Sequence, residues 1–252
     1  MLTGISLFSG AGGLDIAAKL AGIKTVCYVE NDPYAQGVLM SRMRDGGLDA
    51  APIFEDVRTF RGTSLRGSID VVSGGFPCQD LSVAGKQAGI EAGARSGLWK
   101  EFARIIREVA PRFVCVENVP GLLFSGMGRV LGDLAEMGFD AQWQVLSAAG
   151  VGAPHLRERV FIVAYSQGQP RQQANSGNDS DRKQREPWGK SCRKSWDEIS
   201  SPSWKMDESD VLGKINGVAY RLDRVRCTGN GVIPQCAKIV FDKIIEMSGV
   251  KP

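Results

Sequence analysis

The 252-residue sequence lacks the features that would place it in several broad classes. No hydrophobic run approaches the roughly 20 residues that a membrane-spanning helix needs. The chain starts without a basic leader and a small-residue cleavage site, so we expect no signal peptide. Its six cysteines never form a Cys-x-x-Cys pair, and several lie in apolar runs, which argues against a disulfide framework and a zinc site. We therefore predict a cytoplasmic protein with reduced thiols and no metal.

The sequence also has little excess charge. A formal net charge of +3 is shared by many ordinary enzymes and does not identify a polyanionic partner. Basic residues nevertheless crowd one polar segment, residues 166–226, which has few aliphatic side chains and includes Trp188, Trp196 and Trp204. Two interpretations stay open: a nucleic-acid-binding surface of basic and aromatic side chains, or a solvated insertion anchored by its tryptophans.

The rest of the chain alternates short apolar runs with segments of helical periodicity. Strands are expected at residues 3–8, 25–29, 54–57, 69–72, 112–116, 142–147 and 160–164. Helices are expected at residues 14–20, 33–43, 98–109, 127–137 and 234–247. This alternation predicts an α/β fold, a mostly parallel sheet with helices on both faces.

A glycine-rich turn, residues 9–13, joins the first strand to the first helix. Such a turn lets a ligand approach the backbone beside a helix N-terminus, although it can also be a tight turn without a ligand. Glu30 follows Gly10 by 20 residues, the spacing at which nucleoside-binding folds place an acid for ribose hydroxyls. Glu30 could instead be a solvated strand-end residue or a helix cap, and Asp32 before Pro33 is interpreted mainly as a cap.

Cys78 lies in the stretch Pro77-Cys78-Gln79, just after an apolar strand and the pair Gly74 and Gly75. An ordinary free cysteine is a small buried hydrophobe, but a stiff proline and a glycine-rich loop favour a presented thiol. Other polar residues also follow strands, namely Glu30, Asp56 and Glu117. Because carboxyl ends of parallel strands share one rim of a sheet, we expect these groups to converge on one crevice. Arg157 and Arg159 alternate in an extended segment and should point the same way.

Together and in order, these motifs resemble the cytosine-C5 DNA methyltransferase family. Residues 8–13 resemble its cofactor loop, Pro77-Cys78-Gln79 its nucleophile motif and Glu117-Asn118-Val119 its acid motif. Arg157-Glu158-Arg159 resembles its twin-arginine motif and Gly229-Asn230 its closing motif. The resemblance covers nearly the whole chain except residues 166–224, at the family's variable target-recognition position. His155 stands where the family commonly has glutamine, and no Thr-Leu pair is found in the recognition segment.

The resemblance implies a Rossmann-like S-adenosylmethionine-dependent methyltransferase sheet with a small irregular target-recognition lobe. It implies a catalytic and cofactor-binding domain at residues 1–165, a target-recognition region at 166–226, and a C-terminal segment, 227–252, that returns to the first domain. It implies that Cys78 adds to C6 of a flipped cytosine, while protonated Glu117 with Arg157 and Arg159 relieves charge at N3. The other implied catalytic residues are Gln79 and Asn118. The implied cofactor-binding residues are Phe8, Ser9, Gly10, Gly12, Leu14, Glu30, Asn31, Asp56, Val57, Pro77, Leu98 and Asn230.

The implied substrate is a short specific sequence in double-stranded DNA, and the implied protein is a monomer of the small bacterial or phage type. Such a protein either has a cognate restriction endonuclease encoded nearby or protects phage DNA, and both interpretations stay open. Two alternatives remain: an RNA cytosine-C5 methyltransferase on the same scaffold, and a catalytically silent DNA-binding relative. The tRNA-directed branch usually carries Cys-Phe-Thr in its recognition region, which is absent here. A silent relative would typically have lost Cys78 or Glu117, and both are present.

Overall fold

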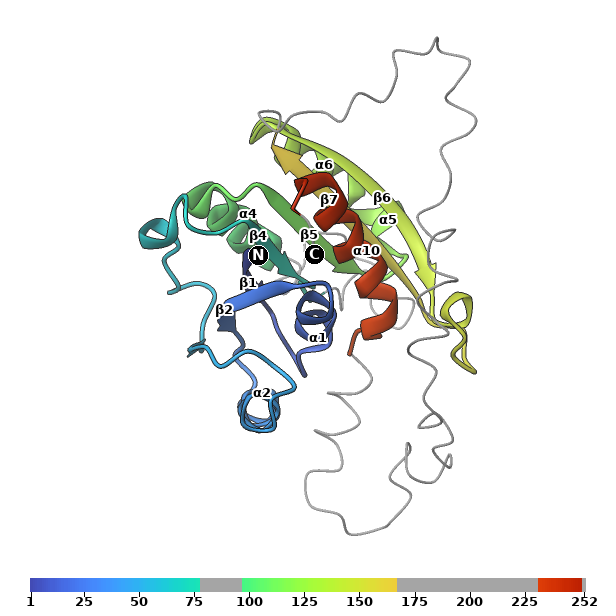
Figure 1. Ribbon diagram of the computed structural model, residues 1–252. Coiled ribbons are helices and arrows are strands. Elements are labelled where there is room, and N and C mark those ends of the chain that lie inside the picture. Colours follow the sequence, from blue (N-terminus) through green and yellow to red (C-terminus); the bar gives the residue numbers. More distant parts are fainter. Residues whose placement is uncertain (78–96, 167–230, 251–252) are drawn as a thin grey trace.

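The computed structural model describes residues 1–77, 97–166 and 231–250 (Figure 1). The predictions for residues 78–96 and 167–230, including the target-recognition lobe, lie outside these ranges. In the described part of the chain, no helix is long and apolar enough to cross a membrane. The boundaries of the three predicted regions stay a prediction.

A seven-stranded sheet forms the centre, in the order β3-β2-β1-β4-β5-β7-β6. The first five strands along the chain are parallel, and β7 and β6 complete the sheet as an antiparallel pair beside β5. Their bounds are β1 Leu2–Leu7, β2 Ile23–Val29, β3 Ile53–Phe54, β4 Val71–Gly74, β5 Phe113–Asn118, β6 Phe139–Ser147 and β7 Glu158–Ser166. Because β7 runs antiparallel, its beginning rather than its end lies beside the carboxyl end of β5.

Helices cover both faces of this sheet, which confirms the predicted α/β architecture (Figure 1). One face packs against α4 and α6, through residues such as Phe102 and Val130, and the other against α1 and α10, through residues such as Ala17 and Phe241. The helix bounds are α1 Gly13–Leu20, α2 Pro33–Arg44, α4 Leu98–Val109, α5 Leu122–Ser125, α6 Met127–Glu136 and α10 Pro234–Ser248. The two buried layers hold the parallel strand ends in place.

The last helix connects the end of the chain to its beginning. α10 packs against α1 and contacts β5 and β7, although more than 200 residues separate it from α1 (Figure 1). Phe241 and Ile244 of α10 are fully buried in the same cluster as Ala17. The segment 231–233, which leads into α10, is thereby brought beside the glycine-rich turn that precedes α1.

The predicted strands and helices are confirmed in type and differ in extent. β3 has only two residues and ends before Asp56, whereas β6 and β7 each have nine and pair along their full length. β3 and β6 are the two edge strands of the sheet, each with a single neighbour. β3 pairs only with Tyr28 and Val29 at the end of β2, whereas β6 pairs with all nine residues of β7.

Candidate active site

A cavity of about 500 Å³ opens at the rim where the parallel strands end. Its walls come from the ends of β1, β2, β4 and β5, from β7 and from the segment before α10. Ten of the predicted cofactor residues line it: Phe8, Ser9, Gly10, Leu14, Glu30, Asn31, Asp56, Val57, Pro77 and Leu98. Three of the predicted catalytic residues line it as well: Glu117, Asn118 and Arg159. The convergence expected from the strand ends is therefore present for the described residues.

The glycine-rich turn owes its shape to left-handed backbone conformations. Phe8 has φ 54° and Gly10 has φ 54°, and the Ser9 amide donates to the Val29 carbonyl at 3.2 Å. Phe8 is not glycine, so its conformation is uncommon and is typical of residues held for function. Its ring packs against Phe102 of α4 with centroids 6.2 Å apart. The turn thus presents Phe8 and Gly10 to the cavity.

Gly12 has a structural role in this turn. It precedes α1 with φ 79°, and a Cβ there would lie 2.8 Å from a methyl group of Leu48 and 3.0 Å from one of Leu39. Gly12 is not among the residues that line the cavity. The close packing of α1 on these leucines explains the glycine.

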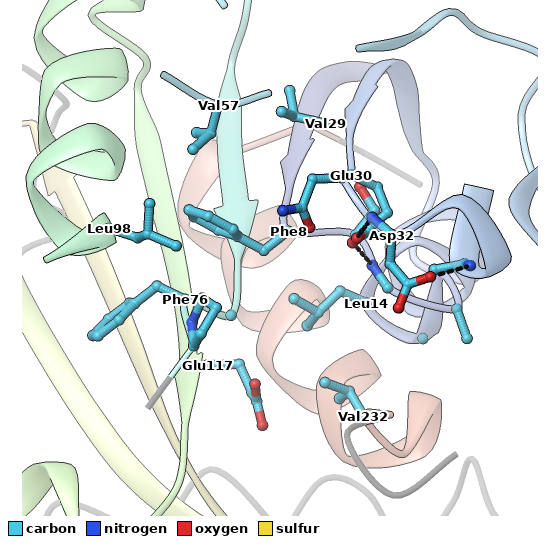
Figure 2. A pocket seen from close by; sticks show the side chains of 18 of the residues that line it. Phe8, Leu14, Val29, Glu30, Asp32, Val57, Phe76, Leu98, Glu117 and Val232 are labelled. Atoms are coloured by element: carbon cyan, nitrogen blue, oxygen red, sulfur yellow. Dashed lines mark hydrogen bonds between the residues drawn. The ribbon is translucent and has the colours of Figure 1, made fainter. Parts of the chain in front are cut away.

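Glu30 connects two segments of the chain at one side of the cavity (Figure 2). One carboxylate oxygen accepts the Gly10 amide at 2.6 Å, and the other accepts the Asp32 amide at 2.8 Å. Glu30 therefore ties the glycine-rich turn to the start of α2 while lining the cavity. A carboxylate oxygen has two lone-pair sites, so each oxygen retains one for a ligand hydroxyl. Asp32 caps α2, accepting the Tyr34 amide at 2.9 Å, which confirms its predicted structural role.

An apolar region lies next to this carboxylate. Figure 2 shows Phe8, Val29, Val57 and Leu98 around one part of the cavity, with Glu117 and Val232 in another. Asp56 reaches the rim just after β3, where its carboxylate accepts the Arg58 amide at 2.9 Å. This part of the cavity offers flat apolar contacts beside acidic hydrogen-bond acceptors.

Glu117 is the buried acid of the site. It lies near the carboxyl end of β5 with 7 % of its surface exposed. Burial raises its pKa to about 7, although Arg159 and Arg157 oppose that rise. Arg159 Nε lies 2.9 Å from Glu117 Oε1. A carboxyl with this pKa is partly protonated near neutral pH, as a general acid requires.

The two arginines have different partners. Arg159 lines the cavity beside Glu117, whereas Arg157 donates to the Gly231 carbonyl at 2.7 Å and is not a lining residue. Both guanidinium groups nevertheless act electrostatically on Glu117. Gly231 and Val232, which were not predicted, line the cavity because the segment before α10 closes against this pair. They directly follow the closing motif Gly229-Asn230 in the chain, and the packing of α10 against α1 brings them to the cavity.

Asn118 ties β5 to the loop that follows β4. Its side-chain nitrogen donates to the Phe76 carbonyl at 3.3 Å, and its side-chain oxygen accepts the Val119 amide at 2.8 Å. The Phe76 ring packs on Trp99 of α4 with centroids 5.4 Å apart. These contacts hold Phe76 and Pro77 at the cavity wall. The next residues of the motif, Cys78 and Gln79, lie outside the described ranges, as does Asn230.

The described cysteines are not candidates for a nucleophile. Cys27, Cys115 and Cys236 are free and buried. Burial raises the pKa of the Cys27 thiol to about 12 and raises that of Cys115 as well. Because the thiolate is the reactive form, these residues behave as small core side chains.

Twelve of the lining residues were not among the predicted site residues, although Ala11, Gly13 and Val119 belong to motifs quoted above. The set comprises Ala11, Gly13, Val29, Asp32, Ala35, Glu55, Arg58, Gly75, Phe76, Val119, Gly231 and Val232. Most of them adjoin predicted site residues in the chain, so a wider window around each motif would have found them. Gly231 and Val232 directly follow the predicted residue Asn230, so the same window would have found them.

Sequence comparisons give the family directly. The model of C-5 cytosine-specific DNA methylases matches residues 2–218. The type II methyltransferase M.AquIA of Picosynechococcus is 37% identical over 174 residues, which cover 63% of this chain and 70% of that protein. M.PspPI of Psychrobacter is 36% identical over 164 residues, 63% of this chain. M.Eco47II of Escherichia coli is 36% identical over 167 residues, 64% of this chain. The matches span only 38% and 39% of the last two relatives.

Solved structures share the fold over nearly the full chain. The Dnmt2 methyltransferase of S. pombe matches with a TM-score of 0.63 at 15% identity, covering 98% of this chain and 99% of that one. The methyltransferase EhMeth of Entamoeba histolytica matches with a TM-score of 0.65 at 12% identity, covering 98% of each. At these identities the likeness shows the methyltransferase fold alone, which confirms the predicted fold class. The family model matches more than half of the length of the chain, so the chain belongs to the C-5 cytosine-specific DNA methylase family.

Proposed function

We propose that this protein transfers a methyl group from S-adenosylmethionine to C5 of cytosine in double-stranded DNA. The observation that carries the proposal is one cavity lined both by Glu30 with its apolar neighbours and by the Glu117–Arg159 pair. A nucleoside-type cofactor and a base would thus meet in one enclosed space. Family membership supports the reaction type, and the named type II methyltransferases support DNA as substrate.

The residues present fit S-adenosylmethionine. The cofactor has a ribose diol, a flat adenine and a sulfonium cation. Glu30 retains acceptor sites for the hydroxyls, and Phe8, Val57 and Leu98 offer apolar contacts for the adenine. Besides Glu117, four acidic residues line the cavity against two arginines, which suits a cation: Glu30, Asp32, Glu55 and Asp56, against Arg58 and Arg159. Ser9, Asn31, Leu14 and Pro77 complete the wall, and Asn230 is proposed on the motif alone.

The base would occupy the part of the cavity near Glu117. When bound, the cofactor supplies an electrophilic methyl group. Cytosine C5 is too weak a nucleophile by itself, so the Cys78 thiolate adds to C6 and makes C5 nucleophilic. Protonated Glu117 donates a hydrogen bond to N3 and so relieves the charge that builds up on the cytosine ring. Arg159 holds the other carboxyl oxygen of Glu117. Loss of the C5 proton and elimination of Cys78 then restore the base.

The partners follow from this chemistry. In a stacked, paired cytosine, C6 cannot be reached by a thiolate and N3 cannot be reached by a buried carboxyl group. The base must therefore flip out of the duplex. We propose that residues 166–226, with their basic and tryptophan residues, contact the DNA, and that residues 227–252 complete the catalytic domain. We further propose a monomer that acts beside a cognate restriction endonuclease, in the cytoplasm.

The proposal is tested by transfer of labelled methyl groups from S-adenosylmethionine to unmethylated duplex DNA. Matched RNA is assayed in parallel, and the product is sequenced at single-base resolution. We expect label on C5 of cytosines in one short recurrent sequence. Label on RNA alone would replace the DNA substrate by RNA, and no label on either, despite cofactor binding, would indicate a silent relative.

Two variants test the roles of individual residues. Cys78→Ala should abolish transfer while cofactor binding persists, because the nucleophile acts on the base only. Cys27→Ala changes a core cysteine of β2 that does not line the cavity, and the variant should transfer methyl groups at the wild-type rate. A Cys78→Ala protein with wild-type activity would refute the covalent mechanism.

A further inference from the structure

Gly75 lies at the point where β4 leaves the sheet, directly beside Glu117 of β5. The strands pair in parallel up to Gly74 and Val116, and the chain of β4 then continues as Gly75, Phe76 and Pro77. A Cβ built on Gly75 would lie 2.5 Å from Glu117 Oε2 and 3.4 Å from the Glu117 carbonyl oxygen. The Glu117 carboxyl group therefore lies directly against the backbone of Gly75. Both Gly75 and Glu117 line the cavity.

The neighbouring glycine has a different reason to be there. A Cβ on Gly74 would collide with the backbone carbonyl of Leu7 and with the Phe102 ring, so Gly74 is needed for strand and helix packing. The three heavy atoms nearest to a Cβ on Gly75 would all belong to Glu117. Gly75 also has no left-handed backbone angle that would require glycine. The side-chain space at Gly75 is thus occupied by the Glu117 carboxyl group.

Other contacts prevent Glu117 and the loop from simply moving apart. Arg159 Nε holds Glu117 Oε1 at 2.9 Å, on the oxygen that does not face Gly75. Asn118 holds the Phe76 carbonyl at 3.3 Å, and Phe76 is buried against Trp99. A side chain on Gly75 would therefore press on an acid whose other oxygen is already engaged.

We propose that Gly75 is a positioning residue, which sets the place of the Glu117 carboxyl against the loop that leads to Cys78. The inference rests on the proposed function and deepens it, because it says why the acid can lie so close to the nucleophile motif. Ordinary contact with a Cβ begins at 3.4 Å, so a methyl group on Gly75 would displace Glu117 Oε2 by roughly 1 Å. A displacement of ~1 Å at a catalytic group can lower the rate about 100-fold.

The test is a double-mutant cycle of Gly75→Ala and Glu117→Asp, assayed by methyl transfer and by cofactor binding. We expect Gly75→Ala to lower kcat about 100-fold, with the dissociation constant of S-adenosylmethionine within about twofold of the wild type. Glu117→Asp withdraws the carboxyl by roughly 1.5 Å and should also lower kcat. The double variant should be no slower than the slower single variant, since the shorter acid no longer meets the new methyl group.

Gly132→Ala provides the matched control. Gly132 lies in α6, and a Cβ there would have no heavy atom within 4 Å. The Gly132→Ala protein should have the same kcat as the wild type. A Gly75→Ala protein that also keeps the wild-type kcat, or effects of Gly75→Ala and Glu117→Asp that multiply, would overturn the inference.

The contact can also be measured without turnover. Gly75→Ala should lower the melting temperature, and adding Glu117→Asp should restore part of the loss. If Gly75→Ala does not fold, the double variant should fold; a double variant that also fails to fold would overturn the inference. A wild-type protein without methyl transfer would refute the proposed function, while the melting cycle would still decide whether Gly75 and Glu117 are coupled.

Discussion

Asp15 makes the stability of this protein depend on pH in a way that one substitution should remove. It lies in the first turn of α1 with 2 % of its surface exposed. Within the described part of the chain, neither carboxyl oxygen makes a hydrogen bond of ordinary geometry. Burial raises its pKa from 3.8 to about 7, Asp49 adds to the rise, and Ser6 and Arg42 partly oppose it. The native state therefore holds a proton that the unfolded chain releases.

The sign and size of the effect follow from this difference. Between the unfolded pKa of 3.8 and the native value of about 7, the native state binds more protons, so the free energy of unfolding falls as pH rises. One pKa unit corresponds to about 1.4 kcal/mol, so ionisation of Asp15 lowers the free energy of unfolding by at most about 4 kcal/mol. About 1.4 kcal/mol of this is lost between pH 6 and pH 8. Asp15→Asn keeps the shape of the side chain and cannot ionise.

Urea unfolding of both proteins between pH 4 and pH 8 measures the prediction. The two proteins should be similarly stable at pH 4, and the variant should become more stable by up to about 4 kcal/mol at pH 8. Asp45→Asn, which changes an exposed carboxyl just after α2, serves as the control and should follow the wild type. Parallel curves for Asp15→Asn and the wild type would show that Asp15 does not titrate in this range, and a less stable variant at pH 8 would show a stabilised carboxylate.

Two further predictions concern the cavity. Glu30→Gln replaces one acceptor of the Gly10 and Asp32 amides by a donor, and an amide left without an acceptor costs ~1–3 kcal/mol. Calorimetry should therefore show the affinity for S-adenosylmethionine reduced at least about tenfold. Unchanged affinity would contradict the role of Glu30. In the proposed mechanism the protonated form of Glu117 is the active one, so kcat/KM should fall about tenfold per pH unit above its pKa of about 7, whereas Glu117→Gln, slower throughout, should lack this fall.

Much of the fold could be predicted from the sequence because its determinants are local. Apolar runs such as Val114 and Val116 in β5 mark strands, the period of Phe102, Ile105 and Ile106 marks α4, and the pair Asp32 and Pro33 marks the start of α2. The acids at strand ends could be predicted for the same reason, since parallel strands deliver their carboxyl ends to one rim. Local pattern therefore indicated many of the residues that reach the cavity, although Gly12 and Arg157 do not line it.

Only the tertiary structure decided how those groups meet. The antiparallel entry of β7 beside β5 pairs Arg159 with Glu117, and the packing of α10 on α1 brings Gly231 to Arg157. The reason for a glycine at position 75 is visible only in the tertiary structure, where Glu117 lies beside it. These contacts join residues distant in the chain, so no local period encodes them. The sequence by itself determined the elements and the chemical groups, and long-range packing determined their distances, burial and pKa values.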